Sequence, residues 1–510
     1  MQKRWAFIAL LVAAACGLQF IGCRGNLNVY DEGLALTGAM RVARGELPYR
    51  DFWTIYSPGQ FYLLAAFMRF TGEGLIVLRH FYAAILAALA VSSAVLGGSL
   101  SRGSSSRRLT VTSILLVISA TLCTSYRHYF HAAPVALLMA MLVLLLGAQP
   151  SPRRFFPAGL LTGLAVLFRH DIGVYLFGSV ASVLLLYPQD RTRRLAPLGW
   201  YVAGSCVLPA SCFGALVSAG AGSAMWDQLV VFPLTVYPGV RSLPWPLFQG
   251  SWSFPRVVET LATNAVILLF AYQFWRLLGL WRDSHRAHSA PDSRIVMMFA
   301  FGVACLLLAK TRPDFAHVFP SAMLALSLTP ALLSEFSVGS KVLALVVATL
   351  FALTGVSASW RQWRASNGYC LSSGVGRGVC GGDATREYDE VIARLGVLTR
   401  PRERIYVGEA VHDRMLTSDA ALYYLAGRMP ACPWHELHPG EATKGTVQTA
   451  IAECLESTKV IVLRQSKPSR EPNLSSKPTG VDTLDRFIKT RYLPLDTFER
   501  YSILTRELQR

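Results

Sequence analysis

Residues 76–99 read IVLRHFYAAILAALAVSSAVLGGS, and Arg79 is the only Asp, Glu, Lys or Arg in that run. An apolar run of about 20 residues is long enough for a helix to cross a bilayer. Hydrophobic residues make up 53% of the 510 residues. Charged residues make up 16%, against about 25% in soluble domains. Comparable runs predict an α-helical polytopic membrane protein with spans at 5–23, 76–99, 109–124, 131–149, 155–169, 172–187, 196–218, 260–281, 294–309, 317–334 and 342–360.

Three apolar regions leave alternatives open. Residues 155–169 and 172–187 are each short, so one broken helix is an alternative to two spans. Residues 57–70 predict a helix on the membrane surface, with a further span as the alternative. Lys3-Arg4 before an apolar run resembles a secretory signal. The run continues to Ile21, which favours an uncleaved first span.

Positive residues occur in alternate loops, and short cytoplasmic loops carry an excess of Lys and Arg. The pattern predicts a cytoplasmic N-terminus and an extracytoplasmic C-terminal region. The chain has many arginines and few lysines, which points to a bacterium and so to its inner (plasma) membrane. The net charge of +18 partly reflects this loop bias, and no nucleic-acid-binding motif is present. The loops hold Arg102, Arg107 and Arg108; Arg153 and Arg154; Arg191, Arg193 and Arg194; Arg282, Arg286 and Arg294; and Lys341.

The chemically varied side chains gather in the opposite set of loops. Asp31 and Glu32 open the first outer loop, directly after the first span. Ionised groups near hydrocarbon are costly and are usually functional, so these two are the candidate catalytic residues. Candidate contacts to a donor phosphate or sugar are Arg50, Tyr56, Arg127, His128, Arg169, His170, Asp171, Lys310, Arg312, Asp314 and His317.

These residue types fit the transfer of a sugar from a lipid-linked phosphate. A carboxylate such as Asp31 can remove the proton of an acceptor hydroxyl. Arginine, lysine and histidine can bind a phosphate and stabilise its charge as it leaves. A membrane site favours a polyprenyl-phosphate donor, and one direct displacement would invert the anomeric centre. A glycan, a lipid or a protein is expected as the acceptor, and the bilayer as the surrounding partner.

The same segments resemble the first loop and second span of C-type (GT-C) membrane glycosyltransferases. The nearest subgroup is the protein mannosyltransferase and aminoarabinose transferase relatives, which are family 39-like, and the likeness covers residues 1–360. It implies a GT-C-like bundle with an outward active site, a hexosyl- or pentosyltransferase activity, and Asp31 as the base. The likeness rests on Asp31-Glu32-Gly33, on the turn from Gly45 to Asp51, and on Tyr56-Ser57-Pro58-Gly59 through Tyr62, with Gly72 and Arg79.

The chain departs from this family at one point. Its relatives often have a basic residue and paired prolines where Tyr56-Ser57-Pro58-Gly59 stands here. A contact to the donor phosphate is therefore expected from elsewhere, such as Arg50, Arg127 or Arg312.

Each candidate also has a structural alternative. Asp is a favoured N-cap, so Asp31 could serve the helix after it. Arg127-His128 is also typical of an anchor at the membrane interface. Arg169-His170-Asp171 could form a buried ion pair. Arg312-Pro313-Asp314 could be a turn that starts a span.

The sequence lacks the motifs of several other classes of site. No His-Glu-x-x-His, Cys-x-x-Cys or phosphate-binding glycine loop occurs, so we expect no cofactor and a metal-free mechanism. A divalent metal held across loops is the alternative, with His128, His131, His170, Asp31 and Glu32 as its ligands. Two other functions stay open. One is a transporter or flippase of lipid-linked saccharides, and the other is a non-catalytic membrane assembly subunit.

Residues 361–510 have the composition of a soluble domain and predict a small extracytoplasmic α/β domain. His412-Asp413 and His435-Glu436 are expected to be exposed. Four cysteines, Cys370, Cys380, Cys432 and Cys454, permit three disulfide pairings, and proximity favours Cys370–Cys380. Strands are predicted at 404–408, 459–464 and 501–505, and helices at 384–398, 418–427, 445–457 and 481–491.

Overall fold

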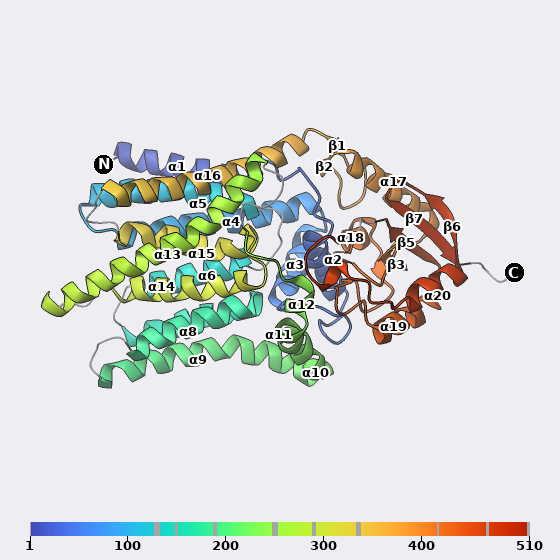
Figure 1. The fold of residues 1–510 in the computed structure, drawn as a ribbon, viewed down its shortest axis with the longest axis horizontal. Helices are drawn as coiled ribbons and strands as arrows, with labels where there is room; N and C mark the ends of the chain where they lie inside the picture. Colours follow the sequence, from blue (N-terminus) through green and yellow to red (C-terminus); the bar gives the residue numbers. More distant parts are fainter. Residues whose placement is uncertain are drawn as a thin grey trace.

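The computed structural model describes residues 2–126, 133–147, 151–186, 191–246, 253–287, 292–332, 338–415, 418–465 and 469–506. Eleven helices in this part of the chain form a bundle, and each overlaps a predicted span (Figure 1). The prediction of a polytopic helical fold is confirmed. The bundle helices are α1 (Gln2–Phe20), α4 (Leu75–Leu100), α5 (Ser105–Cys123), α6 (Ala133–Leu146), α7 (Phe155–Phe168), α8 (His170–Leu186), α9 (Arg191–Leu216), α13 (Phe254–Ala287), α14 (Ser293–Cys305), α15 (Phe315–Leu332) and α16 (Val338–Ala365).

Seven helical segments are long and apolar enough to cross a membrane, judged by length and composition within the described residues. They lie in α4, α5, α13, α14, α15 and α16 and in a continuous stretch that starts in α9. Segments in α1, α6 and α8 are apolar but shorter. Most side chains of α15 are buried inside the bundle, whereas outer helices expose large apolar residues such as Trp275 and Leu345. Exposed apolar surface of this kind suits contact with lipid.

The region 155–187 contains two helices rather than one. Backbone extension at Arg169 (φ −148°, ψ 93°) ends α7, and α8 begins at His170 and packs against α7. A Cβ atom on Gly173 would lie 2.5 Å from the backbone nitrogen of Val166, so only glycine permits this approach. The chain therefore turns back at Arg169, and α8 packs closely against α7.

A layer of short helices lies between the bundle and the C-terminal sheet (Figure 1). In this layer α3 packs against α2 and also contacts α7 and α4. The apolar run predicted as a surface helix thus becomes α3, a short helix held against the first loop. The layer consists of α2 (Asp31–Ala43), α3 (Gly59–Thr71), η3 (Val217–Ala221), α10 (Gly222–Trp226), η4 (Asp227–Val231), α11 (Phe232–Thr235) and α12 (Tyr237–Arg241).

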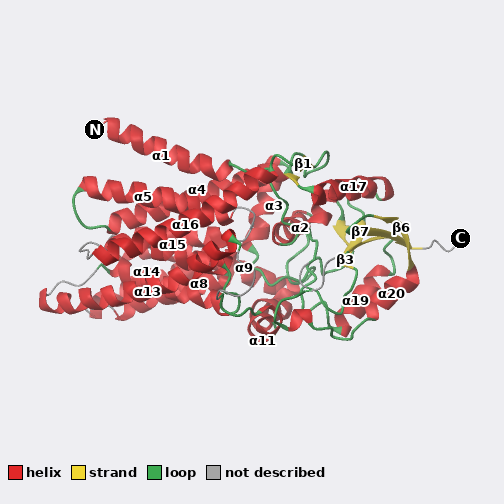
Figure 2. Cartoon of the chain, turned by 45° about the horizontal axis from the view of Figure 1, so that its top comes forward, coloured by secondary structure: helices red, strands yellow, loops and turns green. Residues whose placement is uncertain are grey.

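The C-terminal part is an α/β domain, as predicted (Figure 2). Its sheet has the strand order β4-β3-β5-β7-β6, in which β3 is parallel to β4 and β5, while β7 is antiparallel to β5 and β6. The strands are β3 (Arg404–Glu409), β4 (Met429–Pro430), β5 (Val460–Arg464), β6 (Tyr492–Thr497) and β7 (Tyr501–Arg506). The helices are α17 (Asp383–Leu398), α18 (Ala421–Ala426), α19 (Gly445–Leu455) and α20 (Thr483–Arg491). The 3₁₀ helices among the described residues are η1 (Thr124–Tyr126), η2 (Pro152–Arg154), η5 (Leu306–Lys310) and η6 (Leu474–Ser476).

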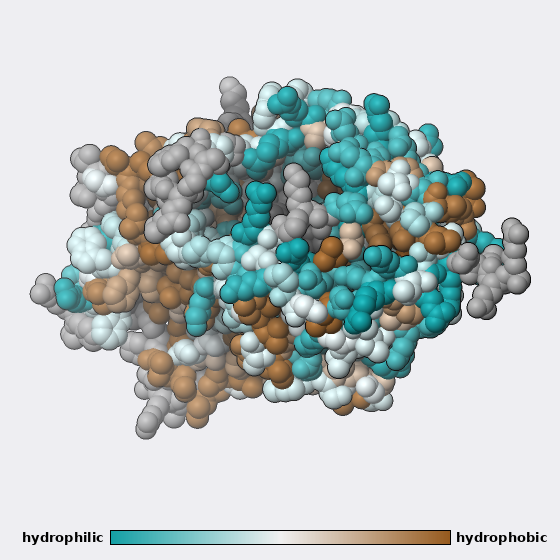
Figure 3. All heavy atoms as spheres, turned by 45° about the vertical axis from the view of Figure 1, so that its right-hand side comes forward, coloured by the Kyte–Doolittle hydropathy of each residue, from teal (hydrophilic) through white to brown (hydrophobic). Residues whose placement is uncertain are grey.

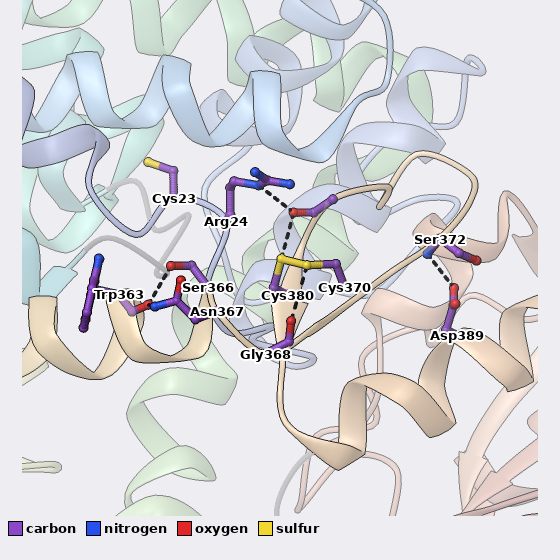
Figure 4. The surroundings of a disulfide bond; sticks show 12 residues. Cys23, Arg24, Trp363, Ser366, Asn367, Gly368, Cys370, Ser372, Cys380 and Asp389 are labelled. Carbon is purple, nitrogen blue, oxygen red and sulfur yellow. Dashed lines mark hydrogen bonds between the residues drawn. A yellow bond between two sulfur atoms is a disulfide. The ribbon is translucent and has the colours of Figure 1, made fainter.

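A disulfide lies where the bundle meets this domain. Cys370 in β1 (Tyr369–Cys370) is bonded to Cys380 in β2 (Cys380–Gly381), which confirms the predicted pairing (Figure 4). The backbone N–H of Cys380 donates to the Arg24 carbonyl at 2.6 Å, and Arg24 Nε donates to the Gly378 carbonyl at 3.1 Å. The hairpin therefore joins the start of the C-terminal domain to the segment that follows α1.

The two ends of the bundle differ in chemistry. The N-terminus lies at the end away from the C-terminal sheet (Figure 1), and the short loop between α4 and α5 carries Arg102. The first loop and the short helices lie at the opposite end. Figure 3 shows apolar side chains over parts of the bundle and mostly polar ones over the C-terminal part.

Candidate functional site

Asp31 is the first residue of α2, at the end of the bundle that carries the C-terminal domain. Tyr30 holds the N-cap position, and Asn28 Oδ1 accepts a hydrogen bond from the Asp31 backbone N–H at 3.0 Å. The Asp31 carboxylate, half-buried, accepts from Asn28 Nδ2 at 3.0 Å. The sequence leaves open whether Asp31 caps this helix. In the structure, the Asn28 side chain accepts the hydrogen bond from the first backbone N–H of α2 instead.

Glu32 points into a different environment, because the next residue of a helix is rotated by about 100°. Its carboxylate is fully buried and accepts two hydrogen bonds of 2.7 Å, from Nε and Nη2 of Arg79. Arg79 also donates to the backbone carbonyls of Cys23 and Asn26. Glu32 thus fastens α4 to the segment before α2, and both of its oxygens are occupied.

The turn between α7 and α8 is joined to the first loop. The His170 ring lies 2.9 Å from Ser57 Oγ, and the His170 backbone N–H donates to the same oxygen at 3.0 Å. Arg169 pairs with Asp171 at 2.7 Å. A Cβ on Gly59 would lie 2.6 Å from the Leu167 carbonyl oxygen, which explains the glycine after Ser57-Pro58. The structure therefore brings the predicted Arg169-His170-Asp171 turn next to the segment that carries Tyr56.

Tyr56 connects this turn to Asp31. Burial raises the pKa of the Tyr56 hydroxyl, and the Glu436 and Asp31 carboxylates raise it further, while Arg169 lowers it. These effects require that Glu436, Asp31 and Arg169 each lie within electrostatic range of Tyr56. Tyr56, Arg169 and Asp31 were predicted from the sequence, whereas Glu436 was expected to be an exposed residue of the C-terminal domain.

Three arginines converge on Tyr237 of α12. Burial raises the pKa of its hydroxyl, and Arg241, Arg312 and Arg169 each act to lower it. They come from α12, from the loop after η5 (Leu306–Lys310) and from the α7–α8 turn. Arg169 and Arg312 were predicted site residues, whereas Arg241 was not among the candidates. We call Arg169, Arg241 and Arg312 the arginine cluster.

Carboxylates hold part of the arginine cluster in place. Arg312 donates to Glu471 through Nη2 at 2.8 Å and Nη1 at 3.0 Å, and Nη1 also donates to the Arg241 carbonyl at 3.0 Å. Asp314 lies 3.5 Å from Arg312 and accepts from the His317 ring at 2.7 Å. Lys310 is exposed at the end of η5. The predicted group at 310–317 is therefore an ordered turn that presents Arg312 to α12.

Arg50 lies in a different part of the surface. It is 44% exposed, pairs with Asp51 at 2.8 Å and donates to the Ala219 carbonyl at 3.3 Å. With Arg41, Glu46 and Arg404 it lines an open depression of about 470 Å³. The described contacts do not bring Arg50 to the arginine cluster. Arg127 and His128 lie outside the described residues.

A loop of the C-terminal domain contacts the first loop of the bundle next to Asp31. His435 and Glu436 are buried rather than exposed, which corrects the sequence-based expectation. The Tyr30 hydroxyl donates to Glu436 Oε1 at 3.2 Å, and the His435 ring packs edge-on against Phe52. His412 is also buried, between Tyr406 and Asp485, so it serves the domain core. The sequence gives no signal for the Tyr30–Glu436 contact, which joins residues 406 positions apart.

Among the described residues, no group of three His, Cys, Asp or Glu side chains is arranged to hold a metal ion. The chemistry that the described arrangement can offer is a half-buried carboxylate, Asp31, beside buried phenols and the arginine cluster. Such a set suits proton removal at one point and binding of an anion at another.

No protein-family model and no curated protein matches the chain. Solved structures do. ArnT from Cupriavidus metallidurans bound to undecaprenyl phosphate matches with a TM-score of 0.59 and 15% identity, over 98% of each chain. The apo state of the same protein matches with a TM-score of 0.57 and 17% identity, over 98% of this chain and 97% of that one.

The chain therefore has an ArnT-like fold. This confirms, at the level of the fold, the aminoarabinose transferase likeness predicted from the first loop. The match covers the C-terminal domain as well as the bundle, whereas the likeness seen in the sequence stopped at residue 360.

Proposed function

We propose that this protein is a membrane glycosyltransferase that moves a sugar from a polyprenyl-phosphate donor to an acceptor hydroxyl. The observation that carries the proposal is the placement of Asp31 beside Tyr56, with Arg169 and the rest of the arginine cluster nearby. An ArnT-like fold supports it, and the undecaprenyl phosphate in the ArnT structure supports a lipid phosphate as the donor class.

Asp31 is proposed as the base that removes the acceptor proton. It is the half-buried carboxylate of the Asp31-Glu32 pair, whereas both oxygens of Glu32 are held by Arg79. We therefore assign catalysis to Asp31 and a structural part to Glu32. The oxygen of the acceptor attacks the anomeric carbon, the bond from that carbon to the phosphate oxygen breaks, and one displacement inverts the centre.

The arginine cluster is proposed to bind the departing lipid phosphate. Arginines stabilise phosphate through paired, charge-assisted hydrogen bonds. Asp171 and Glu471 fix two of these guanidinium groups before any ligand binds, so little ordering is needed when the phosphate arrives. His170, Lys310, Asp314 and His317 are proposed to support this region, and Arg127 and His128, which lie outside the described residues, remain proposed phosphate contacts.

The site is proposed to open on the extracytoplasmic side of a bacterial inner membrane. The basic residue Arg102 lies in a loop at the other end of the bundle, and cytoplasmic loops are enriched in arginine. The first loop and the C-terminal domain would then face the outside together.

The test is sugar transfer in membranes from a deletion strain complemented with wild type, Asp31→Asn or Asp383→Asn. Asp383 is the matched control, because it is also the first residue of a helix but is exposed and lies in α17. With a panel of labelled polyprenyl-phosphate sugars and the acceptors of the membrane, we expect Asp31→Asn to lower transfer by about 100-fold or more. Asp383→Asn should match wild type at equal expression.

Two results would decide against the proposal. Full transfer by Asp31→Asn would remove Asp31 as the base. No transfer by wild type with any donor of the panel would favour transport of lipid-linked saccharides or a non-catalytic assembly role.

A further inference from the structure

Hydrogen bonds hold the loop after β4 against the first loop of the bundle. Arg41 Nη1 donates to the carbonyls of Cys432 and Pro433 at 3.1 and 3.2 Å. The Trp53 backbone N–H donates to the Pro433 carbonyl at 3.3 Å. Farther along the loop, the Leu437 backbone N–H donates to Ser418 Oγ at 3.1 Å. These contacts fix the backbone on both sides of Glu436.

The Glu436 carboxyl group is buried but only half satisfied. One oxygen, Oε1, accepts from the Tyr30 hydroxyl. In the part of the chain that the structure describes, the other oxygen, Oε2, has no hydrogen-bond partner, although the residue is fully buried. Buried polar atoms are nearly always hydrogen-bonded, and an exception calls for an explanation. A ligand that supplies the missing hydrogen bond is such an explanation.

Glu436 is close to groups from both parts of the proposed site. It is within electrostatic range of Asp31 at the start of α2 and of Arg241 in the arginine cluster. In an inverting displacement, the donor sugar must lie between the base and the departing phosphate. A side chain near both Asp31 and Arg241 is therefore placed beside the sugar.

We propose that Glu436 binds a hydroxyl group of the donor sugar, so that the C-terminal domain supplies a sugar-binding residue to the membrane bundle. This inference rests on the proposed function and goes beyond it, because it gives the C-terminal domain a direct part in substrate binding. The free oxygen of Glu436 and the neighbouring Tyr30 hydroxyl together form the binding site.

The protonation state of the Glu436 carboxyl group favours a neutral hydrogen-bonding partner. Burial raises the pKa of Glu436 to about 8; Tyr30 and Arg241 act against this rise, and Asp31 adds to it. The group is then largely protonated at pH 7. A protonated carboxyl can both donate and accept, as a sugar hydroxyl can, whereas binding an ammonium group would favour the ionised form.

The experiment measures binding in lipid nanodiscs with the purified full-length protein. Each variant is titrated with polyprenyl-phosphate sugars and, separately, with the same polyprenyl phosphate without sugar. The variants are Glu436→Ala, Glu436→Gln and Glu441→Gln. Glu441 is the control, since it is a carboxylate at the end of the same loop but pairs with Lys444 at 2.7 Å.

We expect Glu436→Ala to weaken binding of the sugar-bearing lipid about tenfold and to leave the bare lipid unchanged, since one hydrogen bond in a dry site is lost. Glu436→Gln keeps a donor and an acceptor and should stay within about threefold of wild type, as should Glu441→Gln. Glu436→Gln also keeps the shape of the loop, so its result separates lost binding from lost folding.

The outcomes distinguish this inference from the proposed function. Unchanged binding of the sugar-bearing lipid in Glu436→Ala, or equal weakening for both lipids, would overturn the role of Glu436. The absence of any binding of sugar-bearing lipid by wild type would overturn it as well. Glu436-dependent binding without transfer in membranes would instead keep the sugar contact and remove the transferase proposal.

Discussion

Two neighbouring carboxylates of α2 have different environments. Asp31 lies in the polar cluster with Tyr56 and Glu436 nearby, and Glu32 is locked to Arg79 on another side of the helix. The sequence shows both as one acidic pair, because Arg79 is 47 residues away and nothing local marks it as a partner. Only the three-dimensional arrangement therefore separates Asp31, the proposed base, from Glu32, which forms a structural ion pair.

Because the pKa of Glu436 is raised in the folded protein, the free energy of unfolding should depend on pH. Its folded-state pKa of about 8 lies above its ordinary value of 4.5. Between these values the folded protein binds the extra proton, so stability falls as pH rises through about 8. The charged groups that face the carboxyl are Asp31 and Arg241, with Tyr30 as the hydrogen-bond donor.

Glu436→Gln removes this titration. We expect the thermal midpoint of wild type to fall more steeply between pH 6 and 9 than that of Glu436→Gln, measured by scanning fluorimetry in nanodiscs. Glu441→Gln should follow wild type. Parallel curves for wild type and Glu436→Gln would contradict the raised pKa.

At the scale of elements, α2 touches the C-terminal domain through a glycine. A Cβ on Gly33 would lie 2.3 Å from the backbone nitrogen of Ala421, the first residue of α18. That nitrogen donates to the Val29 carbonyl at 3.0 Å. The glycine of Asp31-Glu32-Gly33 is therefore required by packing, which the family likeness alone did not explain.

Gly33→Ala should loosen this contact. Overpacking against backbone costs about 1–3 kcal/mol, so we expect a lower thermal midpoint and weaker sugar-lipid binding. Gly396→Ala in α17 is the control, because open space surrounds that position and alanine there should stabilise by about 0.5–1 kcal/mol. A wild-type midpoint for Gly33→Ala would show that α2 and α18 do not pack this closely.

Buried elements were easier to predict than edge elements. The strands β3 and β5 are apolar and lie inside the sheet, and both were predicted. The edge strand β6 was missed; it contains Pro494 and its side chains are mostly exposed, so its sequence lacks the expected apolar pattern. The two-residue strands β1, β2 and β4 are too short to leave any periodic signal.

At the scale of the whole molecule, hydropathy predicted the bundle and the C-terminal domain because each span and strand carries its own local pattern. It did not predict how the two parts meet. The contacts from Arg41 to Pro433 and from Tyr30 to Glu436 join residues about 400 positions apart, and loop closure over such a distance leaves no periodicity in the sequence. The missed site residues lie at this junction, whereas Asp31, Arg169 and Arg312 lie in loops whose charge stands out against the apolar spans.

The disulfide at the junction gives a last prediction. Cys370–Cys380 closes a loop with a sequence separation of 10 residues, for which chain-entropy arguments give about 2–3 kcal/mol of stabilisation. The hairpin is also held to Arg24 after α1, so its loss should loosen the connection between the bundle and the domain. We expect a double Cys370→Ser, Cys380→Ser variant to unfold at a lower temperature than wild type, and reductant to lower the midpoint of wild type but not of the variant. Cys206→Ser is the control, because Cys206 is a free, exposed cysteine of α9. Equal midpoints for wild type with and without reductant would mean that the bond contributes nothing to holding the two parts together.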